Sequence, residues 1–235
     1  MERIDFPALI WSMFSGMGTS LAIFGLTLAI ALPLGLAVVA LQQATKLPDV
    51  SIPHGRFSIR KYLKLILRFI VRAYLLIMRG TPLMLQLFFF YFGPYYIFGI
   101  RGADRFVMAI VAFGLNYTAY FAEIYRGGIE SISIGQYEAA EALGFTKSQT
   151  FFKIILPQVI KRITPPMGNE FMSLVKDTAL ARVIAVAEMF DVAAKAASGS
   201  ASTIPFVMAG VFYLIMNSVV EQGFKRAERK LEYYK

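Results

Sequence analysis

Polar and ionisable side chains recur at helical spacing within stretches of the chain that are otherwise apolar. Asn116, Tyr120 and Glu123 follow one another at i, i+4 and i+7, and Arg79 stands seven residues before Gln86. These intervals place each set on one face of a helix. An ionisable group inside an apolar helix is costly unless it is paired or faces water. The pattern therefore indicates helices whose polar faces meet in a shared interior.

A later stretch carries the same pattern twice. Asn169 stands seven residues before Lys176, and Glu170 stands seven residues before Asp177, with Ser173 between them. Carboxylates suit an ammonium group, whereas Arg, Lys and amide groups suit a carboxylate. An interior lined by both kinds of group would suit a zwitterion.

The alternative is that these groups only hold the helices together. Arg79 with Glu123, or Lys176 with Asp177, would then form pairs that neutralise each other. Three separate stretches that each supply charged and hydrogen-bonding groups favour the binding interpretation. The predicted path consists of Arg79, Gln86, Asn116, Tyr120, Glu123, Asn169, Lys176 and Asp177.

The composition argues against several other kinds of chemistry. The chain has no cysteine, a single histidine (His54, in a polar segment) and no HExxH pattern. We therefore expect neither a catalytic cluster nor a metal site, and not an enzyme. A GxxxxGK(S/T) loop is also missing, so the chain is not expected to bind ATP itself. Its net charge of +9 is spread between apolar runs, so nucleic acid is not an expected partner.

The elements that must position the polar residues are membrane helices, because 57% of the 235 residues are hydrophobic. The second apolar stretch is too long for one straight span. We interpret it as one long helix that bends at Thr81-Pro82, with arginines of its first half snorkelling at the interface. An interfacial helix followed by a span is the alternative. The five predicted spans are Phe14–Leu41, Tyr62–Ile100, Phe106–Tyr125, Pro165–Val186 and Ile204–Phe224.

The distribution of basic residues predicts the orientation of the spans. Segments 42–72, 126–162 and 225–235 contain 17 of the 24 Lys and Arg, whereas 4 lie on the opposite side and 3 lie within spans. Basic segments are retained on the cytoplasmic side. The loop Gly128–Lys161 and the C-terminus are therefore predicted in the cytoplasm, and the N-terminus outside.

That loop contains two predicted short helices. Ser133 with Gln136, and Thr146 with Gln149, both fit the capping box, in which two side chains satisfy helix N-terminal amides reciprocally. Gly144 stands where the first helix should end, at a position that commonly needs a left-handed backbone. A compact polar unit between apolar spans is shaped to be bound by another protein.

The loop also fits a long fixed pattern: E-A-A, three residues, G, nine residues, I-x-L-P. It ends at Pro157, which is predicted to stop the second helix. The pattern occupies Glu138, Ala139, Ala140, Gly144, Ile154, Leu156 and Pro157. In these residues the loop resembles the EAA loop of ABC importer permeases. The resemblance implies coupling to an ATPase through Gln136, Glu138, Ala139, Ala140, Glu141, Gly144, Leu156 and Pro157.

Four motifs in order extend the resemblance over nearly the whole chain. RGTPLMLQL starts at Arg79, AYFAEIYRGGIESI at Ala119, GQYEAAEALG at Gly135 and PPMGNEFMSLVKDTAL at Pro165. In these motifs the chain resembles the polar amino acid permeases of the histidine/glutamine type. Two departures are that KDTAL stands where KDTSL is usual, and that the segment 42–61 is longer than expected.

The resemblance implies an all-α integral membrane protein of the type I ABC importer fold, with one transmembrane domain over residues 1–235 and a cytoplasmic coupling loop at 128–161. The implied partners are a dimer of ABC ATPase subunits, a second permease chain (identical or a close paralogue), an extracytoplasmic amino acid binding protein and membrane lipid. ATP and Mg²⁺ would belong to the ATPase, so no cofactor is expected in this chain. The implied location is the bacterial cytoplasmic (inner) membrane.

A secondary amino acid transporter or a channel without an ATPase is the alternative. Such a protein would more often show inverted repeats and broken helices in matching halves. The sequence shows no internal repeat.

Overall fold

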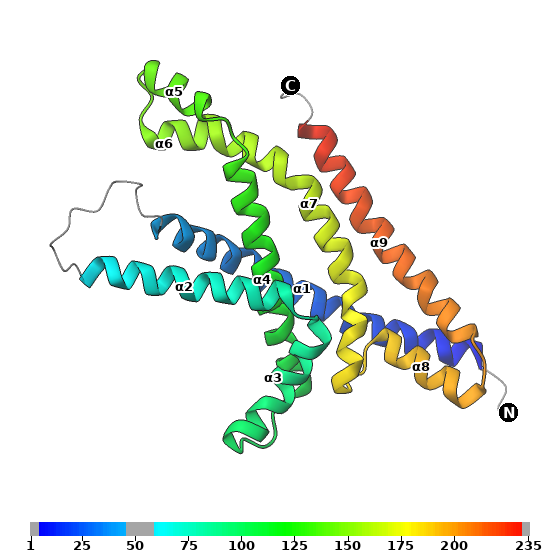
Figure 1. Ribbon diagram of the computed structural model, residues 1–235. Coiled ribbons are helices and arrows are strands. Elements are labelled where there is room, and N and C mark those ends of the chain that lie inside the picture. The colour runs from blue at the N-terminus through cyan, green and yellow to red at the C-terminus, as the bar shows by residue number, and fades with distance from the viewer. Residues whose placement is uncertain (1–4, 46–58, 232–235) are drawn as a thin grey trace.

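The computed structural model describes residues 5–45 and 59–231, and no strand occurs in these two ranges (Figure 1). His54 and most of the polar segment around it lie outside the described residues. In chain order the helical elements are α1 Phe6–Ala44, α2 Ile59–Gly80, α3 Leu83–Phe98, α4 Arg105–Glu130, α5 Ile134–Ala142, α6 Lys147–Thr150, a π-helical turn Phe151–Ile155, α7 Leu156–Asp177, a 3-10 helix Thr178–Ile184, α8 Met189–Ser200 and α9 Ile204–Leu231.

Helix α1 packs against α4, and together they form the centre of the core. Buried positions of α1 recur every four residues at Thr27, Ala31, Gly35 and Val39, so a stripe of mostly small residues faces inward. A Cβ added at Gly35 would lie 3.2 Å from the backbone nitrogen of Ala122. Small residues allow membrane helices to approach this closely.

Within the described ranges, three helices are long and apolar enough to cross a membrane: α1, α4 and α9. The α2–α3 pair meets the same criterion as one broken span. Helix α7 does not, because polar residues such as Glu170 and Asp177 lower its hydropathy. It nevertheless runs beside α9 (Figure 1), and a Cβ added at Gly168 would lie 3.0 Å from the Phe224 ring. Its packing therefore places α7 within the helix bundle.

The predicted bend at Thr81-Pro82 is confirmed, but it is a break and not a curve. Helix α2 ends at Gly80, α3 begins at Leu83, and the two helices form an angle of 112°. A proline cannot donate to the carbonyl four residues earlier, so the hydrogen-bond ladder ends here. The stretch Tyr62–Ile100 is thus two helices and not one long bent helix.

The prediction that Pro157 ends a helix was wrong. The chain is helical from Lys147 through Asp177, and Pro157 lies in the first turn of α7. A π-helical turn precedes it, in which the N–H of Leu156 bonds to the carbonyl of Phe151. Proline is tolerated in a first turn, where its missing N–H costs little, and the wider π turn absorbs the change in register.

The predicted boundaries of the fourth span change accordingly. Pro165 lies inside α7 instead of starting the span, and the last part of the span, Thr178–Ile184, is a tighter 3-10 helix. Its end is marked by Ala185, which has a left-handed backbone with φ +57°.

Helix α8 was not predicted. Its N-cap, Glu188, is fully buried and accepts hydrogen bonds from the N–H groups of Phe190 (2.8 Å) and Asp191 (2.7 Å). The hydroxyls of Tyr213 (3.1 Å) and Ser20 (3.4 Å) also donate to it. A buried carboxylate with four donors ties α1 and α9 to the start of α8.

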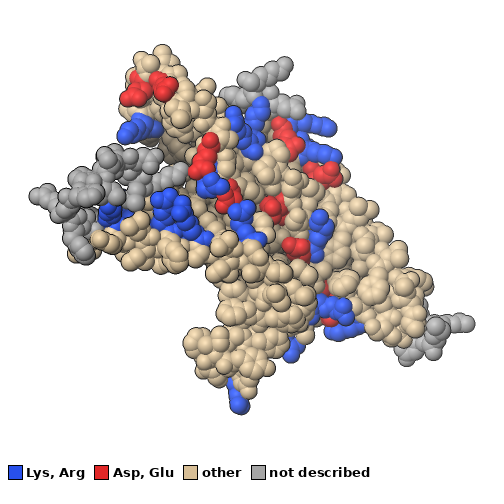
Figure 2. Space-filling model, viewed as in Figure 1, with Lys and Arg blue, Asp and Glu red and all other residues tan. Residues whose placement is uncertain are grey.

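Charge is distributed unevenly over the face shown in Figure 2. Lys and Arg gather over α2 and over the C-terminal half of α9, whereas α3 carries no charged residue. Large apolar side chains on α3, such as Phe89, Tyr96 and Phe98, are exposed. An apolar surface of this kind suits lipid or another membrane helix.

Candidate functional site

A cavity of about 570 Å³ lies between α4, α7 and the break that separates α2 from α3. Its polar lining consists of Arg79, Thr81, Asn116, Tyr117, Tyr120, Glu170, Ser173 and Asp177. Four of the eight predicted path residues belong to this lining. The remaining four, discussed below, lie behind the cavity or face other surroundings.

The acidic wall of the cavity is built by α7 with help from α4. The hydroxyl of Tyr117 donates to Oδ2 of Asp177 at 2.8 Å, across 60 positions of the chain. Glu170 and Ser173 lie on the same face of α7, because positions separated by three, four and seven residues coincide on a helix. The spacing of Glu170 and Ser173 with Asp177 was visible in the sequence, yet the predicted path contained only Asp177. Tyr117 carried no signal that set it apart from the other aromatic residues of α4.

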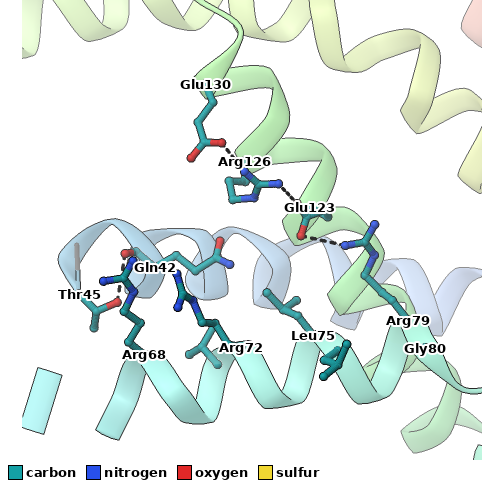
Figure 3. A pocket seen from close by; sticks show the side chains of 12 residues that line it. Gln42, Thr45, Arg68, Arg72, Leu75, Arg79, Gly80, Glu123, Arg126 and Glu130 are labelled. Carbon is teal, nitrogen blue, oxygen red and sulfur yellow. Dashed lines mark hydrogen bonds and ion pairs between the residues drawn. The ribbon is translucent and has the colours of Figure 1, made fainter. Parts of the chain in front are cut away.

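The basic wall is Arg79, at the end of α2. Its Nη1 lies 2.9 Å from Oε2 of Glu123, and its guanidinium carbon lies 5.8 Å from the centroid of the Tyr120 ring. Glu123 also pairs with Arg126, and Arg126 with Glu130 (Figure 3). The Arg79–Glu123 pair considered as a structural alternative is therefore formed, and Glu123 lies outside this cavity, in a neighbouring one.

Two of the three predicted amides, Gln86 and Asn116, donate hydrogen bonds to the backbone at the break at Pro82. Because Pro82 has no N–H, the carbonyl of Met78 loses its helical donor. The amide nitrogens of Gln86 and Asn116 both donate to that carbonyl at 2.9 Å, and Asn116 also donates to the Gln86 side-chain oxygen at 3.0 Å. Gln86 further donates to the carbonyl of Thr81 at 3.1 Å. Inside a membrane protein a freed carbonyl needs such a partner, so the donors of both amides serve the backbone.

The last two predicted path residues face elsewhere. Asn169 and Lys176 are exposed and do not line the cavity. Lys176 and Asp177 are neighbours in the chain, so their side chains point in different directions, and in the described structure they form no ion pair. Within residues 5–45 and 59–231, no cluster of His, Asp and Glu could hold a metal ion.

The predicted coupling loop is a helical unit that projects from one end of the molecule (Figure 1). Gly144 has φ +76°, as predicted, and the N–H groups of Gly144 and Phe145 bond to the carbonyls of Glu141 (2.9 Å) and Ala140 (3.0 Å). These two bonds form a Schellman motif, which ends α5 and satisfies two of its last carbonyls.

Of the two predicted capping boxes, one is formed. Thr146 accepts from the N–H of Gln149 at 3.3 Å, while the Gln149 side chain accepts from the N–H of Thr146 at 2.9 Å. The prediction of a capping box at Ser133 was wrong. The Ser133 hydroxyl does cap α5, but it accepts from the N–H of Gly135. The Gln136 side chain accepts from Gln158 of α7 at 3.2 Å. The Gln136 side chain, which the capping box would require, is instead bonded to a residue of another helix.

The remaining predicted coupling residues divide by exposure. Glu138, Ala139 and Glu141 are exposed, as is Leu143, at 76% of its surface. Ala140 is buried at 1% and holds α5 against the rest of the loop, whereas Leu156 and Pro157 are half-buried at the start of α7.

Beside the loop lies a cavity of about 690 Å³, lined by Gln136, Lys153, Ile154, Pro157, Gln158, Lys161, Arg162 and Pro165. Ile134 (73%) and Tyr137 (39%) of the loop are exposed as well, and apolar surface rimmed by polar residues is typical of a protein-binding site.

Comparison with protein families finds a match to the model described as binding-protein-dependent transport system inner membrane component, over residues 51–233. The chain is 35% identical to the octopine transport system permease protein OccM of Rhizobium radiobacter, over 94% of this chain and 88% of that protein. It is 39% identical to the L-cystine transport system permease protein TcyB of Bacillus subtilis, over 72% of each chain. It is 37% identical to the glutamine transport system permease protein GlnP of Escherichia coli K12, over 66% of this chain and 72% of that protein.

Solved structures show the same fold. A chain of an amino acid ABC transporter crystallised with histidines superposes with a TM-score of 0.79 at 28% identity, over 97% of this chain and 100% of that one. A chain of the MetNI methionine ABC transporter in an inward-facing conformation superposes with a TM-score of 0.70 at 18% identity, over 97% and 99%. The second likeness concerns the fold alone.

Proposed function

The chain belongs to the family of binding-protein-dependent transport system inner membrane components, and from that premise we propose that it forms a path for polar amino acids together with a second permease chain. It is a multi-pass membrane permease of the amino acid ABC importers, with the all-α type I importer fold. It is a transport permease and not an enzyme. The energy would come from a separate ATPase, which binds ATP and Mg²⁺.

The observation that supports the substrate class is the cavity that contains both Arg79 and Asp177. An amino acid carries an ammonium and a carboxylate, and charged hydrogen bonds to each are among the strongest available in a protein. We assign the ammonium to Asp177 and Glu170, and the carboxylate to Arg79. Glu123 holds Arg79 at 2.9 Å and would position it, since Glu123 itself lies outside the cavity. Tyr117 would orient Asp177 through their 2.8 Å hydrogen bond.

The coupling loop would transmit the motion of the ATPase. Its exposed tip, with Glu138, Glu141 and Leu143, offers the surface for docking, and Gly144 sets the angle between α5 and α6. The chain continues as a helix from α6 through the π turn into α7, which lines the cavity. A displacement of the loop would therefore reach the substrate site through one helical rod, as required for a two-state change of access.

Uptake by reconstituted complex tests this function. The chain, its permease partner and the ATPase would be purified together and placed in liposomes with an amino acid binding protein. We expect uptake of one or a few polar amino acids that requires ATP and the binding protein. Uptake that proceeds without the ATPase would favour a secondary transporter or channel, and uptake of no amino acid would refute the substrate class.

The proposed orientation places the coupling loop and C-terminus in the cytoplasm and the N-terminus outside. The natural chain has no cysteine, so single substitutions Ser148→Cys and Ser198→Cys provide unique labels. An impermeant maleimide added to intact cells should label Ser198→Cys, whereas Ser148→Cys should react only after the membrane is opened. Labelling of Ser148→Cys in intact cells would show that the chain has the opposite orientation.

A further inference from the structure

A third cavity, of about 700 Å³, lies between α1, α2 and α4, near the end of α4 that leads into the coupling loop (Figure 3). Its charged lining consists of Arg68, Arg72, Arg79, Arg126, Glu123 and Glu130. Four arginines against two glutamates leave a net charge of +2. The cavity is therefore suited to an anion.

The charges are compensated at one end of the cavity only. Arg79 and Arg126 both pair with Glu123, and Arg126 also pairs with Glu130. In the described structure, Arg68 and Arg72 have no ion-pair partner. Figure 3 shows them extending toward the C-terminal end of α1. Among the described residues, the outer end of the cavity thus carries two guanidinium groups without a carboxylate partner.

The same outer end contains an unused acceptor. Gln42 and Thr45, at the C-terminal end of α1, complete the lining beside Arg68 and Arg72. The side-chain oxygen of Gln42 is buried and accepts no hydrogen bond from the described residues. Buried acceptors are usually satisfied, so this oxygen is suited to a donor from a ligand, such as a hydroxyl group.

Helix α2 joins this cavity to an apolar surface. Five of its six basic residues, Lys61, Lys64, Arg68, Arg72 and Arg79, are spaced so that they share an arc of roughly 80° around the helix. Leu63, Ile66, Ile70 and Ile77 occupy the opposite side and are 54–62% exposed. An amphipathic helix of this kind lies in the membrane interface, with its apolar side in contact with acyl chains. An anion that carries acyl chains could therefore use both features together.

We propose that this cavity binds the headgroup of an anionic phospholipid. Arg68 and Arg72 hold the phosphate, since the guanidinium fork matches two phosphate oxygens. The Gln42 oxygen accepts from a headgroup hydroxyl, as in phosphatidylglycerol, and the acyl chains lie along the apolar side of α2. Basic pockets between membrane helices are suited to such headgroups. Because both leaflets carry phosphate groups, the proposal does not depend on the orientation of the chain, nor on the transported amino acid.

Quenching of a single tryptophan by brominated lipid tests the proposal on the full-length chain. The only tryptophan, Trp11, would be replaced by phenylalanine, and Leu76→Trp would place a reporter on the cavity wall, where Leu76 is 75% exposed. We expect brominated phosphatidylglycerol to quench more strongly than brominated phosphatidylcholine. A preference of about fivefold per uncompensated arginine, and so roughly 25-fold for the pair, is the expected size.

Two matched pairs of substitutions separate a site from general attraction. Arg68→Gln with Arg72→Gln should abolish most of the preference, whereas Lys61→Gln with Lys64→Gln should retain most of it. Both pairs remove two charges from the same face of α2, but only the first removes cavity residues. Gln42→Leu should reduce the preference for phosphatidylglycerol over phosphatidate, which has no glycerol hydroxyl. Circular dichroism and monodisperse elution would show that each variant is folded.

Three results would overturn the proposal. The first is equal quenching by the two brominated lipids. The second is an equal loss of preference in the two pairs of variants, which would indicate attraction to the whole basic face. The third is displacement of the brominated lipid by millimolar glycerol 3-phosphate, which would make the ligand a soluble phosphate.

Discussion

The turn and the cap between the two helices of the coupling loop are formed by near neighbours in the chain, whereas the polar cavity is formed by residues from distant helices. In the loop, Thr146 and Gln149 cap one another across three positions, and Gly144 turns the chain by its own conformation. In the cavity, Tyr117 and Asp177 meet across 60 positions. The difference matters for substitutions. A change in the loop alters local geometry that water can partly compensate, whereas a change in the cavity leaves a buried partner without its hydrogen bond.

The largest effect is expected in the cavity, from Asp177→Asn. This change removes the charge proposed to bind the substrate ammonium but keeps the size of the side chain. Hydrogen bonds to charged groups contribute about 1.5–3 kcal/mol, so we expect uptake at low substrate concentration to fall by roughly 10- to 100-fold. Complex assembly and basal ATP hydrolysis should persist.

The neighbouring residue provides the control for that experiment. Lys176→Gln removes an exposed charge next in the chain that does not line the cavity, and uptake should change by less than about twofold, as is usual for a surface site. Parental uptake by Asp177→Asn would remove Asp177 from the proposed site.

A smaller effect on transport is expected in the loop, from Gly144→Val. A β-branched residue at φ +76° costs about 1–3 kcal/mol, and the turn between α5 and α6 should open to relieve it. We expect uptake per ATP hydrolysed to fall roughly fivefold while insertion of the chain is retained. Gly127→Ala is a suitable control, because Gly127 has no positive φ and no atom within 4 Å of an added Cβ. If uptake per ATP hydrolysed is equal in the two variants, the left-handed conformation of Gly144 is not required for coupling.

The third prediction concerns stability and the break at Pro82. Gln86→Leu and Asn116→Leu each remove a donor from the Met78 carbonyl, and Asn116→Leu also removes the donor to Gln86. Each should destabilise the protein by about 1–3 kcal/mol, measured as a lower thermal midpoint of the purified complex. The two effects should not be additive, because the residues share one network. Strict additivity would show that the two amides act independently.

The smallest effect is expected at the helix caps of the loop. Thr146→Ala removes a complete capping box and should cost about 1 kcal/mol of local stability. Gln136→Ala should cost less than about 0.5 kcal/mol, as for an ordinary exposed residue, because no box forms at Ser133. Hydrogen exchange of the N–H groups of α5 and α6 would measure both. A larger effect of Gln136→Ala would show that its bond to Gln158 matters more than a local cap.

The parts of the protein that could be predicted from sequence are those in which the cause lies within a few residues. Apolar runs of membrane length predicted the long helices, Gly144 predicted a left-handed turn, and Thr81-Pro82 predicted where the second stretch changes direction. The family could also be recognised from the sequence, because the EAA pattern and the four longer motifs are contiguous in the chain. The turn at Gly144 and the break at Thr81-Pro82 depend on backbone conformation, and the apolar runs and the motifs are contiguous, so a sequence specifies all of them directly.

Only the tertiary structure decided which partners most of the predicted polar residues have. Helical spacing grouped Glu123 with Asn116 and Tyr120, but packing gave Glu123 to two arginines and used Asn116 to satisfy a backbone carbonyl. The Gln136 side chain likewise bonds to Gln158 of α7 and not to the N-terminus of its own helix. Pro157 lies within a continuous helical segment, although a proline by itself predicts a helix end. The reason is physical: an amide or carboxylate has several acceptable partners, and the choice among them depends on distances between helices that are far apart in the chain.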